Sequence, residues 1–213
     1  MQFAVITGPT TDTASKRIEL ANKSCDGIEL RLDLFKEQLN LDKLTSLKTQ
    51  SRNKTILTLR KRNQGGGYLG PEDRRQSLLL DYLACNSEYV DIEWDTDSEF
   101  FLLIKRLYPN CKIISSFHDF ISTPRDLEKI FTQMKSNDPY AYKICTTANS
   151  FADAYKMLRF IQKKVAEGTR IIGLCMGEYG SITRREGLKA GNYLNYTILH
   201  NRDSCAKGLA KKG

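Results

Sequence analysis

The chain has 213 residues, which is enough for one domain with a sizeable hydrophobic core, and we expect a single domain over residues 1–213. Its hydrophobic fraction of 40% is ordinary for a globular protein, and no apolar run approaches the roughly 18 residues of a membrane span. A formal net charge of +8 favours anionic partners, but no long basic run is interleaved with aromatic residues. These totals argue against a membrane protein and against a nucleic-acid-binding protein.

The chain contains six cysteines, at positions 25, 85, 111, 145, 175 and 205. None forms a CxxC pair or lies at metal-ligand spacing with a histidine, so we expect reduced thiols and no metal site. The first residues lack the basic start and the long apolar core of a signal peptide. Both features are typical of a cytoplasmic protein.

Short runs rich in Ile, Val, Leu and Tyr recur along the chain at intervals of about 23 to 34 residues. Such runs, bounded by turn residues, are typical of short β-strands. We predict strands at Gln2–Thr7, Gly27–Asp33, Thr55–Arg60, Tyr89–Trp94, Lys112–His118, Ala141–Thr146, Arg170–Met176 and Tyr193–Leu199.

Helical patterns separate these runs. We predict helices at Asp12–Ser24, Leu41–Gln50, Asp73–Cys85, Asp97–Tyr108, Asn149–Val165 and Thr183–Lys189, and another that begins at the Thr123-Pro124 pair and ends near Ser136. In the longest helix, apolar residues at helical spacing predict one buried stripe. Its members are Phe151, Ala154, Tyr155, Leu158, Ile161 and Val165.

The alternation of strands and helices determines the predicted fold. Strands that alternate with helices indicate parallel βαβ units. Eight such units in a chain of this length predict a compact α/β fold, the (β/α)8 TIM-type barrel. A doubly wound open sheet is the alternative, but no GxGxxG motif follows the first strand to favour it.

Several predicted strands carry charged residues on one face only. Glu29 and Arg31 share a face of the second strand, Asp91 and Glu93 share a face of the fourth, and Lys143 lies in the middle of the sixth. An antiparallel sheet with one wet face would show the same alternation. Parallel strands covered by helices have no wet face, so we expect these groups inside the barrel, near the carboxyl ends of the strands, where barrel active sites lie.

Six short motifs occur in order along nearly the whole chain. They are Glu29-x-Arg31-x-Asp33, Thr58-Leu59-Arg60 followed by Gly65-Gly66, Asp91-x-Glu93, Ser116-x-His118-Asp119-Phe120 with Thr123-Pro124, Lys143, and Met176-Gly177-x-x-Gly180-x-Ile182-x-Arg184. Each motif alone is weak, but together they resemble type I 3-dehydroquinate dehydratase. The resemblance implies a hydro-lyase of the shikimate pathway, which makes precursors of aromatic amino acids. The family converts 3-dehydroquinate to 3-dehydroshikimate through a Schiff base, without a metal or organic cofactor.

Lys143 is the candidate Schiff-base residue, although a lone lysine in a strand is more often a solvated group on an edge strand. Loss of water β to a ketone needs an electron sink, which a protonated imine supplies. The lysine must attack as the free amine, and an unperturbed lysine with a pKa of about 10.4 is almost wholly protonated at pH 7. We expect burial, together with nearby Arg31 and Arg60, to lower the pKa of Lys143.

His118 is the candidate general acid and base, because the unperturbed pKa of histidine lies near neutral pH. A lone strand histidine is more often structural, but the lysine one strand further on favours a catalytic role. We expect Glu93 to orient His118 through a carboxylate–imidazole hydrogen bond. The alternative for Glu93 is a salt bridge inside the barrel.

The resemblance also implies substrate-binding residues, namely Glu29, Arg31, Arg60, Arg184, Met176 and Tyr196. Arg184 would hold the substrate carboxylate, which suits a planar, bidentate guanidinium. Met176 and Tyr196 would form apolar walls. We expect Asp33 and Asp91 to be structural, and the ligand to be one small anion, 3-dehydroquinate.

The last residues depart from the family pattern. The family closes its site with a loop carrying Ser-Ala-Pro-Gly-Gln, followed by a final helix, whereas this chain has Cys205-Ala206-Lys207-Gly208-Leu209 and then only four residues. Four residues are too few for a stable helix, so we expect an eighth helix that is missing or truncated. The alternative to an active enzyme is therefore a lid-damaged barrel that binds the ligand but turns over poorly or not at all. A homodimer, or a fusion to shikimate dehydrogenase as in some family members, stays open.

Overall fold

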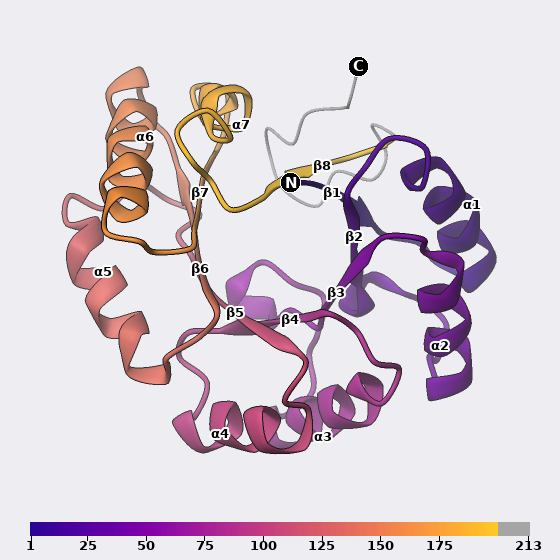
Figure 1. The fold of residues 1–213 in the computed structure, drawn as a ribbon. Helices are drawn as coiled ribbons and strands as arrows, with labels where there is room; N and C mark the ends of the chain where they lie inside the picture. Colours follow the sequence, from indigo (N-terminus) through magenta and orange to yellow (C-terminus); the bar gives the residue numbers. More distant parts are fainter. Residues whose placement is uncertain (200–213) are drawn as a thin grey trace.

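Eight parallel strands form the wall of a barrel in the computed structural model, which describes residues 1–199 (Figure 1). Neighbouring strands follow the order β7-β6-β5-β4-β3-β2-β1-β8. Their bounds are β1 Gln2–Ile6, β2 Gly27–Arg31, β3 Lys54–Thr58, β4 Tyr89–Glu93, β5 Lys112–His118, β6 Ala141–Thr147, β7 Ile171–Met176 and β8 Asn195–Thr197. The predicted (β/α)8 barrel is confirmed.

Helices connect successive strands and surround the barrel (Figure 1). Side-chain caps explain several of their starts; for example, the backbone N–H of Thr13 donates to Thr10 and that of Asp153 to Ser150. The helices are α1 Thr11–Ala21, α2 Leu41–Gln50, α3 Glu72–Leu83, α4 Ser98–Leu107, α5 Leu127–Met134, α6 Phe151–Ala166 and α7 Ser181–Glu186. The predicted truncation of an eighth helix and the altered lid stretch lie outside the described residues.

Several element boundaries differ from the sequence prediction by one to three residues, and side-chain contacts account for two of the differences. The second strand ends at Arg31, not at Asp33, and a 3-10 turn follows at Leu32–Leu34. In this turn the Asp33 carboxylate accepts two hydrogen bonds from the Arg31 guanidinium, at 3.0 and 2.8 Å. Helix α5 begins at Leu127 instead of Pro124, because the side chain of Asp126 caps it.

The buried stripe of α6 was only partly predicted. Ala154, Leu158 and Ile161 are buried as expected, but Phe151 and Tyr155 are about half exposed, at 59% and 50%. The buried face is shifted around the helix and includes Met157, Phe160 and Lys164. A lysine can take an apolar position because its stem packs while its amine reaches a charge, and here the Lys164 amine lies 2.6 Å from Glu128.

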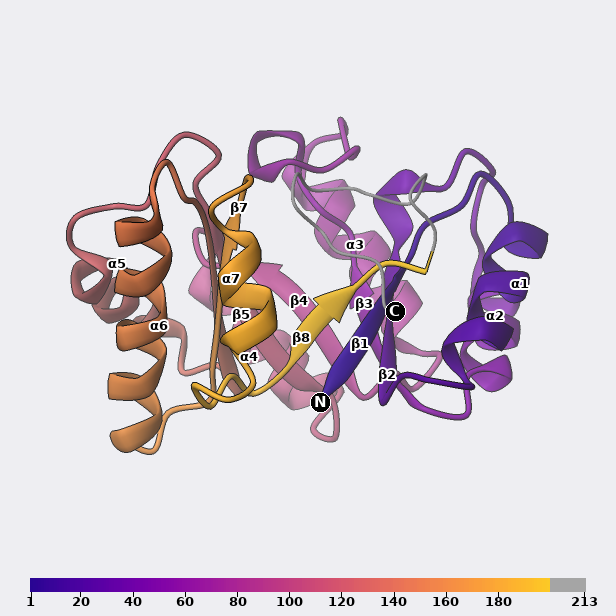
Figure 2. The same cartoon turned by 90° about the horizontal axis from the view of Figure 1, so that it is seen from above.

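A side-chain amide links the two ends of the sheet, where β7 and β8 are not paired as strands. The backbone N–H of Gly173 donates to Asn192 at 2.8 Å, and the Asn192 amide donates back to the Gly173 carbonyl at 2.9 Å. Asn192 therefore makes the pair of bonds that a neighbouring strand would make. Figure 2 shows β8 between β1 and α7 at this seam.

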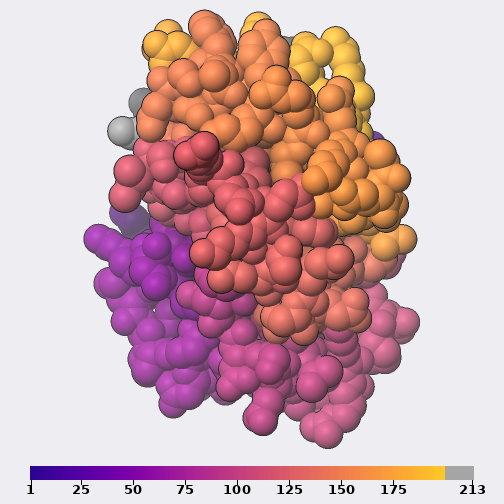
Figure 3. All heavy atoms as spheres, turned by 90° about the vertical axis from the view of Figure 1, so that its left-hand side faces the viewer, coloured from indigo at the N-terminus to yellow at the C-terminus, as the bar shows by residue number. Residues whose placement is uncertain are grey.

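Apolar side chains fill two layers. One layer lies between the strands and the helices, and α5 and α6 cover one side of the barrel in the space-filling view (Figure 3). The other lies inside the barrel and includes Phe3, Ile56, Tyr89, Ile114 and Ala141, which come from five different strands. This inner layer leaves room for the charged side chains towards the carboxyl ends of the strands. Within residues 1–199, no helix is both long and apolar enough to cross a membrane.

Candidate active site

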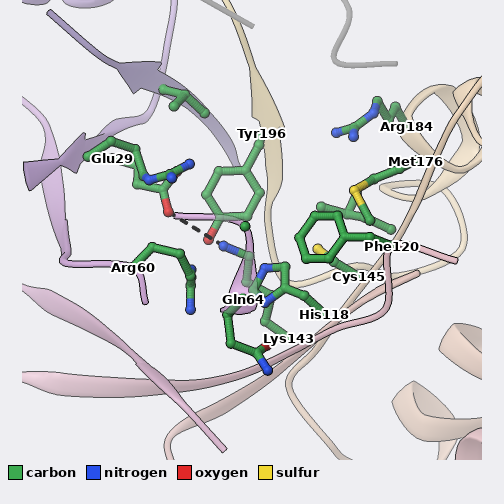
Figure 4. A pocket seen from close by; sticks show the side chains of 14 residues that line it. Glu29, Arg60, Gln64, His118, Phe120, Lys143, Cys145, Met176, Arg184 and Tyr196 are labelled. Carbon is green, nitrogen blue, oxygen red and sulfur yellow. Dashed lines mark hydrogen bonds and ion pairs between the residues drawn. The ribbon is translucent and has the colours of Figure 1, made fainter. Parts of the chain in front are cut away.

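A pocket lies at the carboxyl ends of the strands, where the active sites of (β/α)8 barrels are found. Nearly all of the predicted site residues line it, and Figure 4 shows most of them facing one another. Those lining it are Glu29, Arg31, Arg60, His118, Lys143, Met176, Arg184 and Tyr196. Glu93 is the exception, because it does not reach the pocket wall.

Lys143 lies inside the pocket and is 5% exposed. Its Nζ lies 2.8 Å from Asp91 Oδ2 and 3.4 Å from Glu29 Oε1 (Figure 4 marks the contact with Glu29). The same atom lies 4.2 Å from the centre of the Tyr196 ring. A buried ammonium is stable only when paired, and these two carboxylates and the aromatic face provide that compensation.

The predicted lowering of the Lys143 pKa is wrong. Burial by itself lowers the pKa of this ammonium, but the negative charges of Asp91 and Glu29 outweigh it and hold the pKa well above its ordinary value. Arg60, which lies 2.7 Å from Asp91, lowers the pKa of Lys143 as expected, but its effect is smaller than that of the two carboxylates. Asp91, expected to be only structural, therefore contacts the candidate nucleophile.

The raised pKa predicts that Lys143 reacts slowly as a nucleophile in the ligand-free protein. Below its pKa an amine reacts in proportion to its neutral fraction, so a raised pKa lowers the rate at every such pH. We expect trace acetylation followed by peptide mapping to give a Lys143 rate below that of surface lysines. That rate should still rise with pH beyond about pH 10.4, where an ordinary lysine is half neutral. A rate that levels off below pH 9 would contradict the contacts with Asp91 and Glu29.

His118 ends β5, and its ring is stacked on Phe120 with 6.0 Å between ring centres and 10° between planes. Its Nδ1 is buried and has no hydrogen-bond partner in the described part of the chain. Burial, followed by the positive charges of Arg60 and Lys143, holds the pKa of His118 well below its ordinary value. The imidazole is therefore neutral at neutral pH and can accept a proton.

Glu93 does not form the predicted hydrogen bond with His118. Its Oε1 accepts from the backbone N–H of Lys61 at 3.0 Å and lies 3.3 Å from the Arg60 guanidinium. Its Oε2 lies 2.8 Å from Arg75, an ion pair without the geometry of a directed hydrogen bond. The alternative prediction, a salt bridge inside the barrel, describes the contact of Glu93 with Arg60, whereas Arg75 reaches Glu93 from helix α3.

Sequence analysis gave no role to several residues that line the pocket, including Gln64, Phe120 and Cys145. Strand alternation could have found Cys145, because it lies two residues after Lys143 on the same strand. Gln64 follows β3 in a short 3-10 turn, and its side-chain oxygen is buried without a partner among residues 1–199. Gly65 adopts a φ of +77°, and a Cβ there would lie 2.2 Å from the Phe120 ring, so glycine permits this contact.

Arg184 reaches the pocket from α7, on the same side as Met176 (Figure 4). Its backbone carbonyl accepts a hydrogen bond from Asn195 at 2.7 Å, which fastens α7 to β8. Arg31, Arg60 and Arg184 thus bring three cations to the pocket. In the described chain, no group of three or more His, Cys, Asp or Glu side chains is arranged to hold a metal ion.

The fold and the pocket define a class of protein: a (β/α)8-barrel enzyme with a buried lysine amine, paired carboxylates and a neutral histidine. The family model described as type I 3-dehydroquinase matches residues 2–210, so the chain belongs to that family. It is accordingly a carbon–oxygen lyase of the hydro-lyase class, placed in the shikimate pathway of aromatic amino acid biosynthesis. The resemblance seen in the motifs is confirmed.

Individual relatives agree with this assignment. The 3-dehydroquinate dehydratase of Methanopyrus kandleri is 30% identical over 95% of this chain and 91% of its own length. A bifunctional 3-dehydroquinate dehydratase/shikimate dehydrogenase of Arabidopsis thaliana is 32% identical over 86% of this chain, which corresponds to 30% of that protein. The crystal structure of 3-dehydroquinate dehydratase from Geobacillus kaustophilus superposes with a TM-score of 0.88 at 21% identity, covering 99% of this chain and 86% of the other. Fused relatives therefore exist.

Proposed function

We propose that this chain eliminates water from 3-dehydroquinate to give 3-dehydroshikimate, and that it does so through a Schiff base on Lys143. The observation that carries the proposal is the position of the Lys143 amine inside the pocket, 2.8 Å from a carboxylate. That carboxylate can receive the proton which the ammonium must lose before it attacks the ketone. Asp91 is the nearer acceptor and Glu29 the second.

The proposed reaction then uses the imine as an electron sink. Attack of the free amine on the ketone and loss of that oxygen as water form a protonated imine. Neutral His118 takes the proton α to the imine carbon, and the electron pair moves towards the imine nitrogen. The β-hydroxyl leaves as water with a proton returned by His118, and hydrolysis of the imine releases the product and the amine.

The remaining pocket residues would hold the anionic substrate. Arg184 is proposed to bind its carboxylate in a bidentate manner, since this guanidinium lines the pocket and lies apart from the Lys143 amine (Figure 4). Glu29, Arg31 and Arg60 would hold the ring hydroxyls, and Met176 and Tyr196 would form apolar walls. We also propose that Glu93 contributes to catalysis indirectly, through its contact with Arg60.

The cellular setting and the assembly of the chain are also part of the proposal. The five cysteines of residues 1–199 are free, which favours a cytosolic site of action. We also propose one barrel domain over residues 1–213, without a nucleic-acid partner. A homodimer stays a proposal that a sedimentation measurement would test.

The direct test is to incubate the purified chain with 3-dehydroquinate and follow the absorbing enone of the product. We expect steady-state formation of 3-dehydroshikimate, verified by chromatography. A covalent adduct after borohydride without steady-state turnover would favour the lid-damaged binding barrel. Neither adduct nor turnover at saturating ligand would overturn the proposed function.

A further inference from the structure

A row of alternating charges crosses the barrel wall from the pocket to the outer surface. The row consists of Lys143, Asp91, Arg60, Glu93, Arg75 and Glu72. Its inner end is the amine of Lys143 in the pocket, and its outer end is a carboxylate on the first turn of α3. Arg75 lies in α3, outside the strands, and does not line the pocket (Figure 1).

Each contact in the row is short. Asp91 lies 2.8 Å from Lys143 and 2.7 Å from Arg60, and the Ser116 hydroxyl links the same Asp91 and Arg60 through two hydrogen bonds of 2.6 Å. Glu93 lies between two guanidinium groups, 3.3 Å from that of Arg60 and 2.8 Å from that of Arg75. One residue therefore fixes the next from the surface to the amine.

The row is buried as far as Arg75. The side chains of Asp91, Glu93 and Arg75 are 0% exposed, whereas that of Glu72 is 41% exposed. Charges so far from water interact strongly, and removing one partner leaves its neighbour unpaired. Arg75 is anchored from outside, because Glu72 accepts two hydrogen bonds from it, at 2.9 and 2.6 Å. The guanidinium of Arg75 also donates to the carbonyl of Leu59, the residue before Arg60, at 3.2 Å.

We propose that Arg75 is a positioning residue of the active site, which keeps Arg60 on Asp91 by occupying the other side of Glu93. Without Arg75, the charge of Glu93 falls on Arg60 alone, and Arg60 turns from Asp91 towards Glu93. Asp91 then pairs with Lys143 alone, and this stabilises the ammonium against loss of its proton. The inference rests on the proposed function, because it concerns how readily the Lys143 amine becomes the nucleophile.

Other charged and titratable groups also surround the amine and remain in place in this comparison. They are Glu29, Tyr196 and His118, whereas Arg60 belongs to the row itself. Glu29 contacts Lys143 directly and accepts a hydrogen bond from the Thr58 hydroxyl at 2.9 Å, outside the row. Its effect is therefore common to the native chain and to an Arg75 variant.

The test compares Arg75→Gln, Arg75→Lys and the matched control Arg74→Gln in the whole chain. Arg74 is the exposed neighbour on the same helix, so its variant removes the same charge without touching the row. The first readout is the rate of Lys143 acetylation by acetic anhydride as a function of pH, measured by peptide mapping. This readout needs no dehydratase activity.

We expect Arg75→Gln to slow Lys143 acetylation about tenfold at any fixed pH below the pKa, which corresponds to a rise of about one pKa unit. Arg75→Lys restores the cation beside Glu93 but not the forked hydrogen bonds, and we expect it to recover most of the native profile. Arg74→Gln should leave the profile unchanged. In turnover of 3-dehydroquinate, we expect Arg75→Gln to lower kcat by about 10- to 100-fold, with a smaller change in KM.

The outcomes separate the inference from the proposed function. An unchanged acetylation profile in folded Arg75→Gln overturns the inference, whether or not the chain turns over 3-dehydroquinate. If the acetylation profile changes in Arg75→Gln while the native chain shows no dehydratase activity, the result supports the inference about Arg75 and overturns the proposed function. If Arg75→Gln does not fold, the comparison passes to Arg75→Lys and to Glu72→Gln, which removes the outer anchor. Because Arg75→Lys is expected to stay close to the native profile, a native profile in Glu72→Gln is then the result that overturns the inference.

Discussion

Replacement of Lys143 by alanine is expected to abolish turnover of 3-dehydroquinate and, with it, any covalent adduct formed with borohydride. Reduction converts a transient imine into a stable amine, so the native chain should retain the ligand mass on the peptide that contains Lys143. The amine of Lys143 lies in the pocket with its positive charge held by Asp91 and Glu29. Alanine has no amine, and water that fills the space left by the lysine side chain cannot form an imine with the ketone.

This first prediction needs a control for stability. Breaking a buried ion pair typically lowers the free energy of unfolding by about 3–5 kcal/mol, because it leaves an unpaired charge. All assays should therefore be run well below the melting temperature of the variant. Lys164 provides a matched variant: it is also a buried lysine with carboxylate partners, but it lies in α6, away from the pocket. Lys164→Ala should lose stability and keep the adduct. An adduct on another lysine in native protein would refute the assignment of Lys143.

Replacement of His118 by alanine is expected to lower kcat by about 10²–10⁴-fold, the usual contribution of general acid–base catalysis. Imine formation should persist, because the amine and its carboxylates are untouched, so borohydride should still trap an adduct. Near-native turnover would show that His118 is structural and that another group moves the proton. The variant His200→Ala, which removes the only other histidine, serves as the control.

The pH dependence of the native chain gives a second measurement on His118. A group whose pKa is lowered keeps its basic form at lower pH. The midpoint of the acid limb in the pH profile of kcat/KM should therefore lie below the ordinary histidine pKa of about 6.5. In His118→Ala this limb should disappear. An acid limb that stays in place after the substitution would belong to another group.

Much of the pocket was predictable because strand alternation is a local property. Lys143 and Cys145 face the same side of β6 whatever the neighbouring strands do, and Glu29 and Arg31 share a face of β2 for the same reason. Once helices cover the outside of a parallel sheet, that face has only the barrel interior left. The pocket residues that lie on strands therefore follow from short stretches of sequence, whereas those in the loops, such as Gln64, do not.

The partner of Glu93 was not predictable in the same way. In the sheet register, Glu93 is level with Ser116, which in turn is level with Lys143 on the next strand. This register places Glu93 within reach of Arg60 from one side, and packing of α3 brings Arg75 from the other. A helix that packs on the outside of the strands supplied the decisive cation, and no strand motif contains it.

The amino-acid pattern alone was enough to predict the alternation of eight strands with helices, the inward faces of the strands and membership of the type I 3-dehydroquinase family. Only the tertiary structure decided which carboxylate meets which cation, and hence the sign of the pKa shift of Lys143. The two carboxylates on its amine come from positions 52 and 114 residues away along the chain. Burial alone would lower this pKa, and two contacts of a few ångströms reverse it, because electrostatic energy depends on distances in space that no local pattern of residues encodes.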